Sequence, residues 1–140
     1  MLTVVNPVSG LSIDKSSLTM YVNDEADLKA MVEPMDATNP QISWVSDNAD
    51  VVAVDKAGRV KALKSGTAMI IAVTLDGGHI GTCKVTVYEP VSSVYLNLSD
   101  TVALYKDESV TPEPTVYPKE APNKTLLWST SNSSIATVSA

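Results

Sequence analysis

The chain of 140 residues contains an internal repeat with a period near 84 residues. The phrase "WVSDNADVVAV" that begins at Trp44 returns as "WSTSNSSIATV" from Trp128. Further identities in the same register are Tyr21 with Tyr105, Val32 with Val116, Pro34 with Pro118, Ala37 with Ala121, Asn39 with Asn123 and Asn48 with Asn132. A repeat of this length restricts the fold to an architecture that each unit can adopt in turn.

The repeat divides the chain into three parts. "LTVVNPVS" at Leu2–Ser9 aligns with "VTVYEPVS" at Val85–Ser92, which closes the complete unit. We therefore expect residues 1–7 to be the closing strand of a preceding repeat or an N-terminal extension, and residues 8–89 to be one complete domain. Residues 90–140 then form the first half of a second domain, as in a segment cut from a longer tandem array.

Apolar residues alternate with polar ones through the complete unit, which is the period of half-buried β-strands. The apolar positions of this alternation are Leu18, Met20, Val22, Ala26, Leu28, Ala30, Val32, Ile42, Trp44, Val52, Val54, Val60, Ala62, Ala68, Ile70, Ala72, Cys83, Val85 and Val87. Turn sequences such as "DKAG" at Asp55–Gly58 and "DGG" at Asp76–Gly78 separate the runs. About seven short strands at this spacing predict an all-β, antiparallel β-sandwich, with Trp44 as its largest core side chain.

A set of short motifs in the complete unit resembles the bacterial immunoglobulin-like domain, group 2. The motifs are "PMDATN" at Pro34–Asn39, "WVSDN" at Trp44–Asn48, "VAVD" at Val52–Asp55, "GRVKA" at Gly58–Ala62 and "GTA" at Gly66–Ala68. The resemblance implies an immunoglobulin-like sandwich with Greek-key connections, repeated in tandem and in contact with neighbouring repeats. It continues through residues 91–140.

The same resemblance implies a role outside the cytoplasm. The family is common in bacterial surface proteins, including adhesins, in modular extracellular enzymes and in phage structural proteins. We expect a non-enzymatic spacer, display or adhesion module that is extracellular or on the cell surface. The alternatives are a structural or decoration protein of a phage virion and an accessory module of a secreted glycan-degrading enzyme, because fold does not fix function.

Charge and composition exclude several classes of partner. The formal net charge is −6, whereas nucleic acids and anionic membranes require a cationic surface. We therefore expect no nucleic-acid binding and no direct insertion into a membrane. The single cysteine, Cys83, allows no intrachain disulfide and falls on the apolar phase of its strand.

No group of residues predicts a catalytic, cofactor-binding or metal site. His79 is the only histidine and has no recognisable nucleophile and carboxylate around it, so it is expected to be an exposed turn residue. Acidic residues cluster at Asp24–Asp27 and Asp47–Asp50 without the spacing of a calcium loop, and solvated loop charge is the expected interpretation. Tyr21 and Tyr105 occupy equivalent outward positions in the two repeats. One aromatic ring per repeat is weak support for a glycan-binding site.

One strand carries an unusual outward face. In "GTAMIIAVTL" the outward positions hold Met69, Ile71 and Val73, and the neighbouring strand presents Val45. We expect these residues, with Tyr21, to form an interaction surface for a neighbouring domain or another protein. The alternative is ordinary scattered exposure of β-branched residues.

The half repeat at residues 90–140 has the first strands of a sandwich and lacks the closing three. It would leave open strand edges and apolar side chains such as Leu126, Trp128 and Val138 uncovered. We therefore expect this half to be disordered, or to be completed by another chain through strand exchange.

Overall fold

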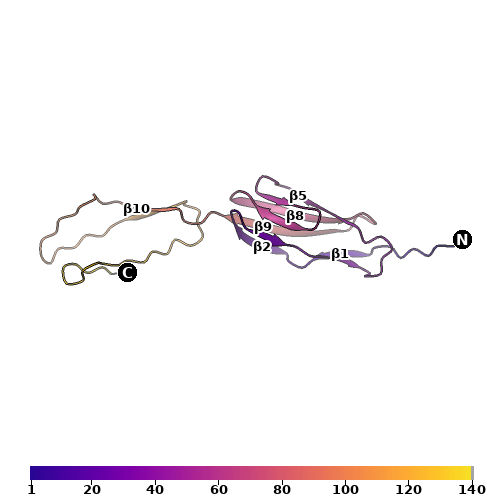
Figure 1. Ribbon diagram of the computed structural model, residues 1–140, viewed down its shortest axis with the longest axis horizontal. Helices are drawn as coiled ribbons and strands as arrows, with labels where there is room; N and C mark the ends of the chain where they lie inside the picture. The colour runs from indigo at the N-terminus through magenta and orange to yellow at the C-terminus, as the bar shows by residue number, and fades with distance from the viewer. Residues whose placement is uncertain (140) are drawn as a thin grey trace. The chain divides into compact units, whose positions relative to one another are not determined.

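The computed structural model describes residues 1–139, and the chain divides into unit 1, Met1–Glu89, and unit 2, which starts at Pro90. Every regular element is a β-strand, as Figure 1 shows. The strands of unit 1 are β1 Gly10–Ile13, β2 Ser17–Tyr21, β3 Glu25–Asp27, β4 Ala30–Glu33, β5 Ile42–Ser46, β6 Val52–Val54, β7 Arg59–Ala62, β8 Gly66–Thr74 and β9 Ile80–Tyr88. Unit 2 contains β10 Ser93–Leu96 and β11 Pro114–Tyr117. Residues 1–139 include no helix long and apolar enough to cross a membrane.

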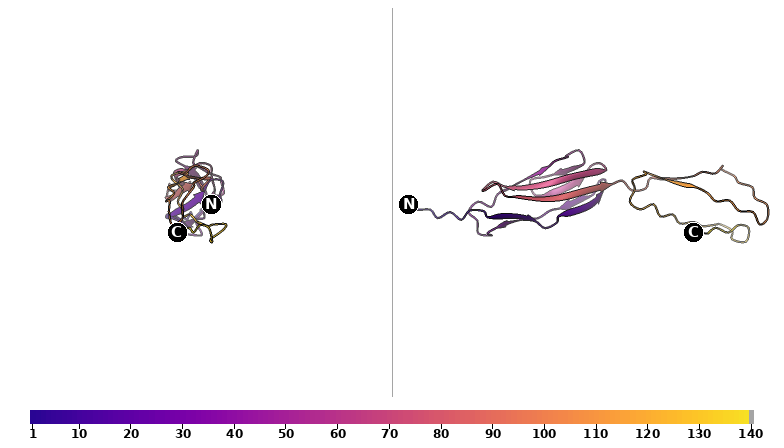
Figure 2. Two further views of the ribbon diagram at one scale, coloured as in Figure 1. Left: turned by 90° about the vertical axis from the view of Figure 1, so that its left-hand side faces the viewer. Right: turned by 180° about the vertical axis from the view of Figure 1, so that it is seen from behind.

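Unit 1 is a sandwich of two layers, visible edge-on in Figure 2. One layer is a four-stranded sheet in the order β2-β9-β8-β5, and the other contains the three-stranded sheet β3-β7-β6 together with the β1-β4 pair. All pairs are antiparallel except β2 with β9, which run parallel with Leu18 opposite Val85 and Met20 opposite Val87. The predicted all-β sandwich is confirmed, with this one parallel pair as an addition.

The core lies between the two layers and consists of small and branched side chains. Its buried members are Met20, Leu28, Val51, Val52, Val60, Ala62, Ala68, Ile70, Cys83, Val85 and Val87. Trp44, predicted to be the largest core side chain, is only partly buried and packs against this cluster from its margin. It lies there because its ring covers the turn that holds Gly58, whose φ is 85°. A Cβ on Gly58 would lie 2.7 Å from the Leu28 carbonyl oxygen and 2.8 Å from the Trp44 ring.

Two strand boundaries differ from the sequence prediction. The run from Ala26 to Val32, expected to be continuous, is split into β3 and β4, and β1 was not predicted as a strand. The split follows from a change of partner, because β3 pairs with β7 whereas β4 pairs with β1. The Asp14 carboxylate accepts a hydrogen bond from the Lys29 backbone N–H at 2.9 Å and occupies the break.

Unit 2 repeats the local structure of unit 1. The register of β10 with β11 (Val94 opposite Val116) matches that of β1 with β4 (Leu11 opposite Val32). Turn hydrogen bonds also recur. In the first recurring turn the Tyr21 N–H donates to the Asp24 carboxylate, as the Tyr105 N–H donates to the Glu108 carboxylate, both at 2.8 Å. In the second, the Ala37 N–H donates to the Pro34 carbonyl, as the Ala121 N–H donates to the Pro118 carbonyl. The rest of residues 90–139 is outside regular strands.

Candidate interaction surface

The outward face of β8 is apolar, as the sequence predicts. Ala68, Ile70 and Ala72 are buried in the core, and the alternation of the strand turns Met69, Ile71 and Val73 to the opposite face, where they are half-buried. No strand of the described chain packs over this face of the four-stranded sheet.

The neighbouring strands extend this apolar face. Val45 on β5 lies directly opposite Ile71 and is 51% exposed. On β9, Ile80 lies directly opposite Val73 and is 62% exposed. We refer to Val45, Met69, Ile71, Val73 and Ile80 as the outer-face patch. The structure thus brings four of the five predicted surface residues together.

Ile80 is a member of the patch that the sequence reasoning missed. On its strand the outward positions Thr82, Lys84 and Thr86 alternate with buried Cys83, Val85 and Val87, and Ile80 is in the same outward phase one step earlier. Extending the alternation back to the turn would have found it.

Tyr21, the fifth predicted residue, lies apart from the patch. Its register partner is Tyr88 at the far end of β9, and the rows that contain Thr86 and Lys84 separate this pair from Ile71. Tyr21 and Tyr88 therefore form a separate aromatic corner of the same face. The grouping of Tyr21 with the patch residues rested on phase alone, which fixes the face of a strand and not the position along it.

Polar groups border the patch and hold its edge strand. The Asp47 carboxylate accepts a hydrogen bond from the Met69 backbone N–H at 2.7 Å, and the Asp47 N–H donates to the Met69 carbonyl at 3.1 Å. Thr82 and Lys84 lie opposite Ile71 and Met69 on β9. The patch itself carries no titratable group, so it is suited to binding and not to acid–base chemistry.

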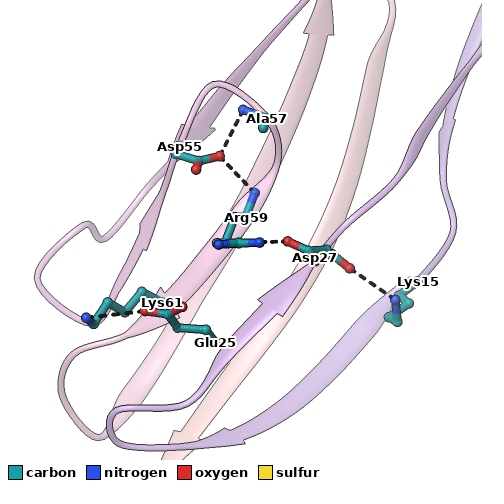
Figure 3. A network of polar contacts seen from close by, with 7 residues as sticks. All are labelled: Lys15, Glu25, Asp27, Asp55, Ala57, Arg59 and Lys61. Carbon is teal, nitrogen blue, oxygen red and sulfur yellow. Dashed lines mark hydrogen bonds and ion pairs between the residues drawn. The ribbon is translucent and has the colours of Figure 1, made fainter.

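The outer face of the three-stranded sheet is charged, as Figure 3 shows. Lys61 pairs with Glu25 at 3.3 Å, and Arg59 pairs with Asp27 at 3.0 Å. The hydrogen bond and charge of Asp27 raise the pKa of Arg59 above its ordinary value. The outer-face patch and the outer face of β3, β7 and β6 thus differ in chemistry, the first apolar and the second paired in charge.

His79 corrects the expectation of an exposed turn residue. The ring is half-buried, and its Nε2 lies 3.0 Å from the carbonyl oxygen of Val8. The Asp76 carboxylate accepts a hydrogen bond from the Val8 N–H at 3.0 Å. The hairpin between β8 and β9 therefore holds the incoming chain on both sides of Val8, which gives His79 a structural role.

The other residues considered for chemistry also have structural roles. Cys83 is buried, and burial raises the pKa of its thiol, which disfavours the reactive thiolate. Asp24, Asp27 and Asp47 accept hydrogen bonds or form ion pairs within unit 1. Within residues 1–139 there is no group of three His, Cys, Asp or Glu side chains that could hold a metal ion.

Unit 2 carries one aromatic pair that the sequence reasoning did not identify. The rings of Tyr95 on β10 and Tyr117 on β11 meet edge to face with their centroids 5.7 Å apart. The two tyrosines, together with Ser93, Asn97 and Thr115, line a shallow open hollow. The pairing register that joins β10 to β11 is the signal that would have placed the two rings together.

Two packed layers of strands around a common apolar core define an immunoglobulin-like β-sandwich domain. The sequence profile of the bacterial Ig-like domain (group 2) matches residues 7–85. The chain belongs to this family, and the predicted resemblance is confirmed.

Relatives come from several biological settings. The chain is 31% identical to an Ig-like virion protein of Serratia phage KSP90, over 96% of this chain and 53% of that protein. It is 29% identical to an alpha-L-arabinofuranosidase of Bifidobacterium longum subsp. longum, over 93% of this chain and 12% of that enzyme. The structure of surface layer protein SbsC, domains 1-6, is similar with a TM-score of 0.50 and 17% identity, covering 66% of this chain and 15% of that one. The chain thus spans at most about half the length of these proteins, and the SbsC likeness shows the fold alone.

Proposed function

We propose that the chain acts as a non-catalytic immunoglobulin-like module that spaces and presents neighbouring domains outside the cytoplasm. The observation that carries the proposal is the path of the chain through unit 1. Val8 is held by Asp76 and His79 at the hairpin that begins β9, and the chain leaves after Tyr88, where β9 ends. The chain therefore enters and leaves the sandwich at opposite ends, visible in Figure 1.

This path suits a module that works in series. The nine residues of β9 at about 3.3 Å each separate the two ends by about 30 Å, so every such domain adds its full length to an array. The incoming segment is fixed by two hydrogen bonds at Val8 and two between Asn6 and Thr38, and Pro90 restricts the backbone of the outgoing segment. Both features favour defined spacing over free rotation.

The outer-face patch supplies the contact surface in this proposal. Contiguous apolar patches on a domain surface mark interaction sites, whereas the outer face of β3, β7 and β6 carries ion pairs. Thr has a high β-propensity, so replacing Met69 and Ile71 by Thr should leave unit 1 folded. The replacement should abolish any association of the chain that the outer-face patch mediates. The measurement is mass by light scattering with a thermal melt. The double substitution Arg59→Thr and Lys61→Thr on the charged face is the matched control. An unchanged association state in the patch variant would contradict this role.

Localisation tests the proposal as a whole. Antibodies against the purified chain should label the cell envelope of the source bacterium or its secreted fraction, as detected by immunogold electron microscopy. Label confined to the cytoplasm would contradict the proposal. Hydrolysis of glycans by the purified chain would contradict the non-catalytic assignment separately.

A phage virion component is the second candidate. It is favoured because the matched region makes up 53% of the Ig-like virion protein, against 12% of the arabinofuranosidase. In that case the same antibodies should label purified phage particles and leave the envelope of uninfected cells unlabelled. The accessory module of a glycan-degrading enzyme, a setting in which one relative occurs, predicts secreted label together with a catalytic domain on the same polypeptide.

A further inference from the structure

The outward side chains of β8 form a continuous apolar line along the four-stranded sheet. Met69, Ile71 and Val73 belong to the outer-face patch, and Leu75, the next residue in the same phase, is 63% exposed. The Leu75 N–H donates to the Gln41 carbonyl at 2.9 Å, so the pairing with the chain before β5 continues to this residue. Because β8 lies between β5 and β9, the line runs along the middle of a face of three strands.

Two charged residues of opposite sign flank this line at Met69. Asp47 follows the end of β5 and is hydrogen-bonded to Met69 through its backbone and its side chain, and Lys84 of β9 lies opposite Met69 on the other side. The two charges are two strand spacings apart, about 10 Å, and therefore do not pair within one copy. Within residues 1–139, Lys84 forms no ion pair and the Asp47 Oδ2 atom accepts no hydrogen bond.

A second copy of the same face matches both properties when a twofold axis along β8 relates the two copies. This axis stacks β8 on β8, so the apolar line meets itself, with Ile71 over Ile71 of the second copy. It also stacks β5 on β9, because the rotation exchanges the two sides of the face. Lys84 of each copy then faces Asp47 of the other, since both lie in the row of Met69. Such a twofold interface contains two of these pairs.

A twofold axis across the strands matches the charges less well. It stacks β9 on β9 in the opposite direction. Lys84 then lies over Ile80 of the second copy if the axis passes near Ile71, or over Lys84 of the second copy if it passes near Met69. The first arrangement buries an unpaired charge against an apolar side chain, and the second brings two like charges together. The axis along β8 instead gives each charge an opposite partner.

We propose that the outer-face patch, together with Leu75, is a homodimer interface in which the β5-β8-β9 faces of two copies of unit 1 pack in parallel, with Lys84 of each copy paired to Asp47 of the other. Packed sheets lie about 10 Å apart, which leaves room for two layers of side chains. The inference rests on the contact role that the proposed function gives to the patch. A parallel arrangement suits that function, because two chains presented from one surface run in the same direction.

Sedimentation of the full chain over a range of concentrations measures the dimer. The face is three strands wide and is smaller than the area of about 800 Å² that each partner buries in a stable complex, so we expect a weak dimer that dissociates on dilution. A chain that stays monomeric at about 1 mM would overturn the proposal. That result would leave the spacing role standing, since immunogold localisation tests it separately.

Charge reversal at Lys84 tests the proposed pair. Lys84→Glu places two like charges across the interface at each pair and should weaken the dimer by about tenfold or more. Lys56→Glu makes the same change in net charge at the turn after β6, in the other layer, and should leave the affinity within about twofold. Equal weakening by the two variants would overturn the proposal, because net charge and not the pair would then be responsible.

A change at Asp47 tests the other member of the pair. Asp47→Asn removes the charge and keeps a side-chain oxygen that can accept the Met69 N–H. Added to Lys84→Glu, it should restore part of the lost dimer affinity. In the dilute monomer the effects of the two changes on the free energy of unfolding should simply add, because the residues are about 10 Å apart. Affinity that is not restored by the second change would contradict the pairing.

Chemical cross-linking tests the orientation of the two copies. A carbodiimide joins an amine directly to a carboxylate in contact with it. Concentrated chain should therefore give a cross-linked dimer in which mass spectrometry finds Lys84 joined to Asp47, and dilute chain should give no such link. Cross-linked dimers without the link between Lys84 and Asp47 would overturn the parallel arrangement and with it the proposal.

Discussion

The two units of this chain begin with the same local sequence and end in different structures. Both contain the β1-β4 type of pair and the same hydrogen-bonded turns, including the Ala37 and Ala121 turns that follow a proline. Among residues 1–139, only those of unit 1 form a buried core cluster and a two-layer sandwich. Local turns thus form from short-range sequence, whereas most strands of the fold depend on partners from the second half of the domain. This is the behaviour expected when non-local pairing dominates a β-sandwich.

The largest expected difference between the units concerns equivalent core positions. Met20→Ala should lower the free energy of unfolding of unit 1 by about 2–5 kcal/mol, because it opens a cavity beneath Val87. Leu104→Ala is the matched change in unit 2. It should change the free energy of unfolding of the chain by less than about 0.5 kcal/mol, since Leu104 covers no core. Urea denaturation followed by tryptophan fluorescence, to which Trp44 and Trp128 both contribute, measures both. Equal effects of the two changes would mean that unit 2 has a core of its own.

A smaller effect is expected at the turn of unit 1 that holds Gly58. Gly58→Ala places a Cβ against the Leu28 carbonyl and the Trp44 ring, in addition to the cost of about 1–2 kcal/mol for a positive φ. Gly78→Ala is the matched control, since Gly78 also has a positive φ and a Cβ added there would meet no atom within 4 Å. Gly58→Ala should therefore destabilise unit 1 more than Gly78→Ala does in thermal melts. The reverse order would show that the Trp44 ring does not cover this turn.

The smallest expected effect concerns acid stability at the break between β3 and β4. Hydrogen bonds from Lys15 and from the Lys29 N–H hold the pKa of Asp14 below its ordinary value. The Asp14 carboxylate therefore contributes to stability at pH values above its unfolded-state pKa, and this contribution is lost as the pH falls through its folded-state pKa. Asp14→Asn should lower the free energy of unfolding near neutral pH and have no such effect in strong acid, as measured by urea denaturation at a series of pH values.

Unit 2 holds Asn97 at the position that corresponds to Asp14, so the repeat itself contains this substitution. The Asp14 N–H also donates to the Lys29 carbonyl at 2.9 Å, and Asn97 keeps this backbone bond, since its N–H donates to the Glu113 carbonyl at 3.3 Å. A cost of Asp14→Asn that is the same at every pH would show that the carboxylate acts through its shape and not through its charge.

The alternation of apolar residues predicted most of unit 1 correctly, because the period of a strand specifies which side chains enter the core. It predicted the burial of Met20, Ile70 and Val85 and the outward position of Met69. It did not reveal that β2 runs parallel to β9, because pairing direction depends on residues far apart in sequence.

The sequence predicted the residues at the centre of the outer-face patch correctly, but it did not predict where the patch ends. Val45 and Ile71 share the outward phase of neighbouring strands, and the pairing of β5 with β8 places them side by side. Tyr21 shares the phase and lies at the far end of the face, since phase alone does not fix the register between strands. The role of His79 could not be read either, because its partner, the Val8 carbonyl, lies 71 residues earlier in the chain.

Amide hydrogen exchange along the whole chain tests the central claim most directly, since it reports which backbone hydrogen bonds are stable against opening. The account predicts strong protection in β8 and β9 of unit 1, and in the free chain no comparable protection in residues 101–105 and 126–130. Equal protection of both units in a monomeric chain would contradict the account, because unit 2 would then be stable without the strands that complete unit 1.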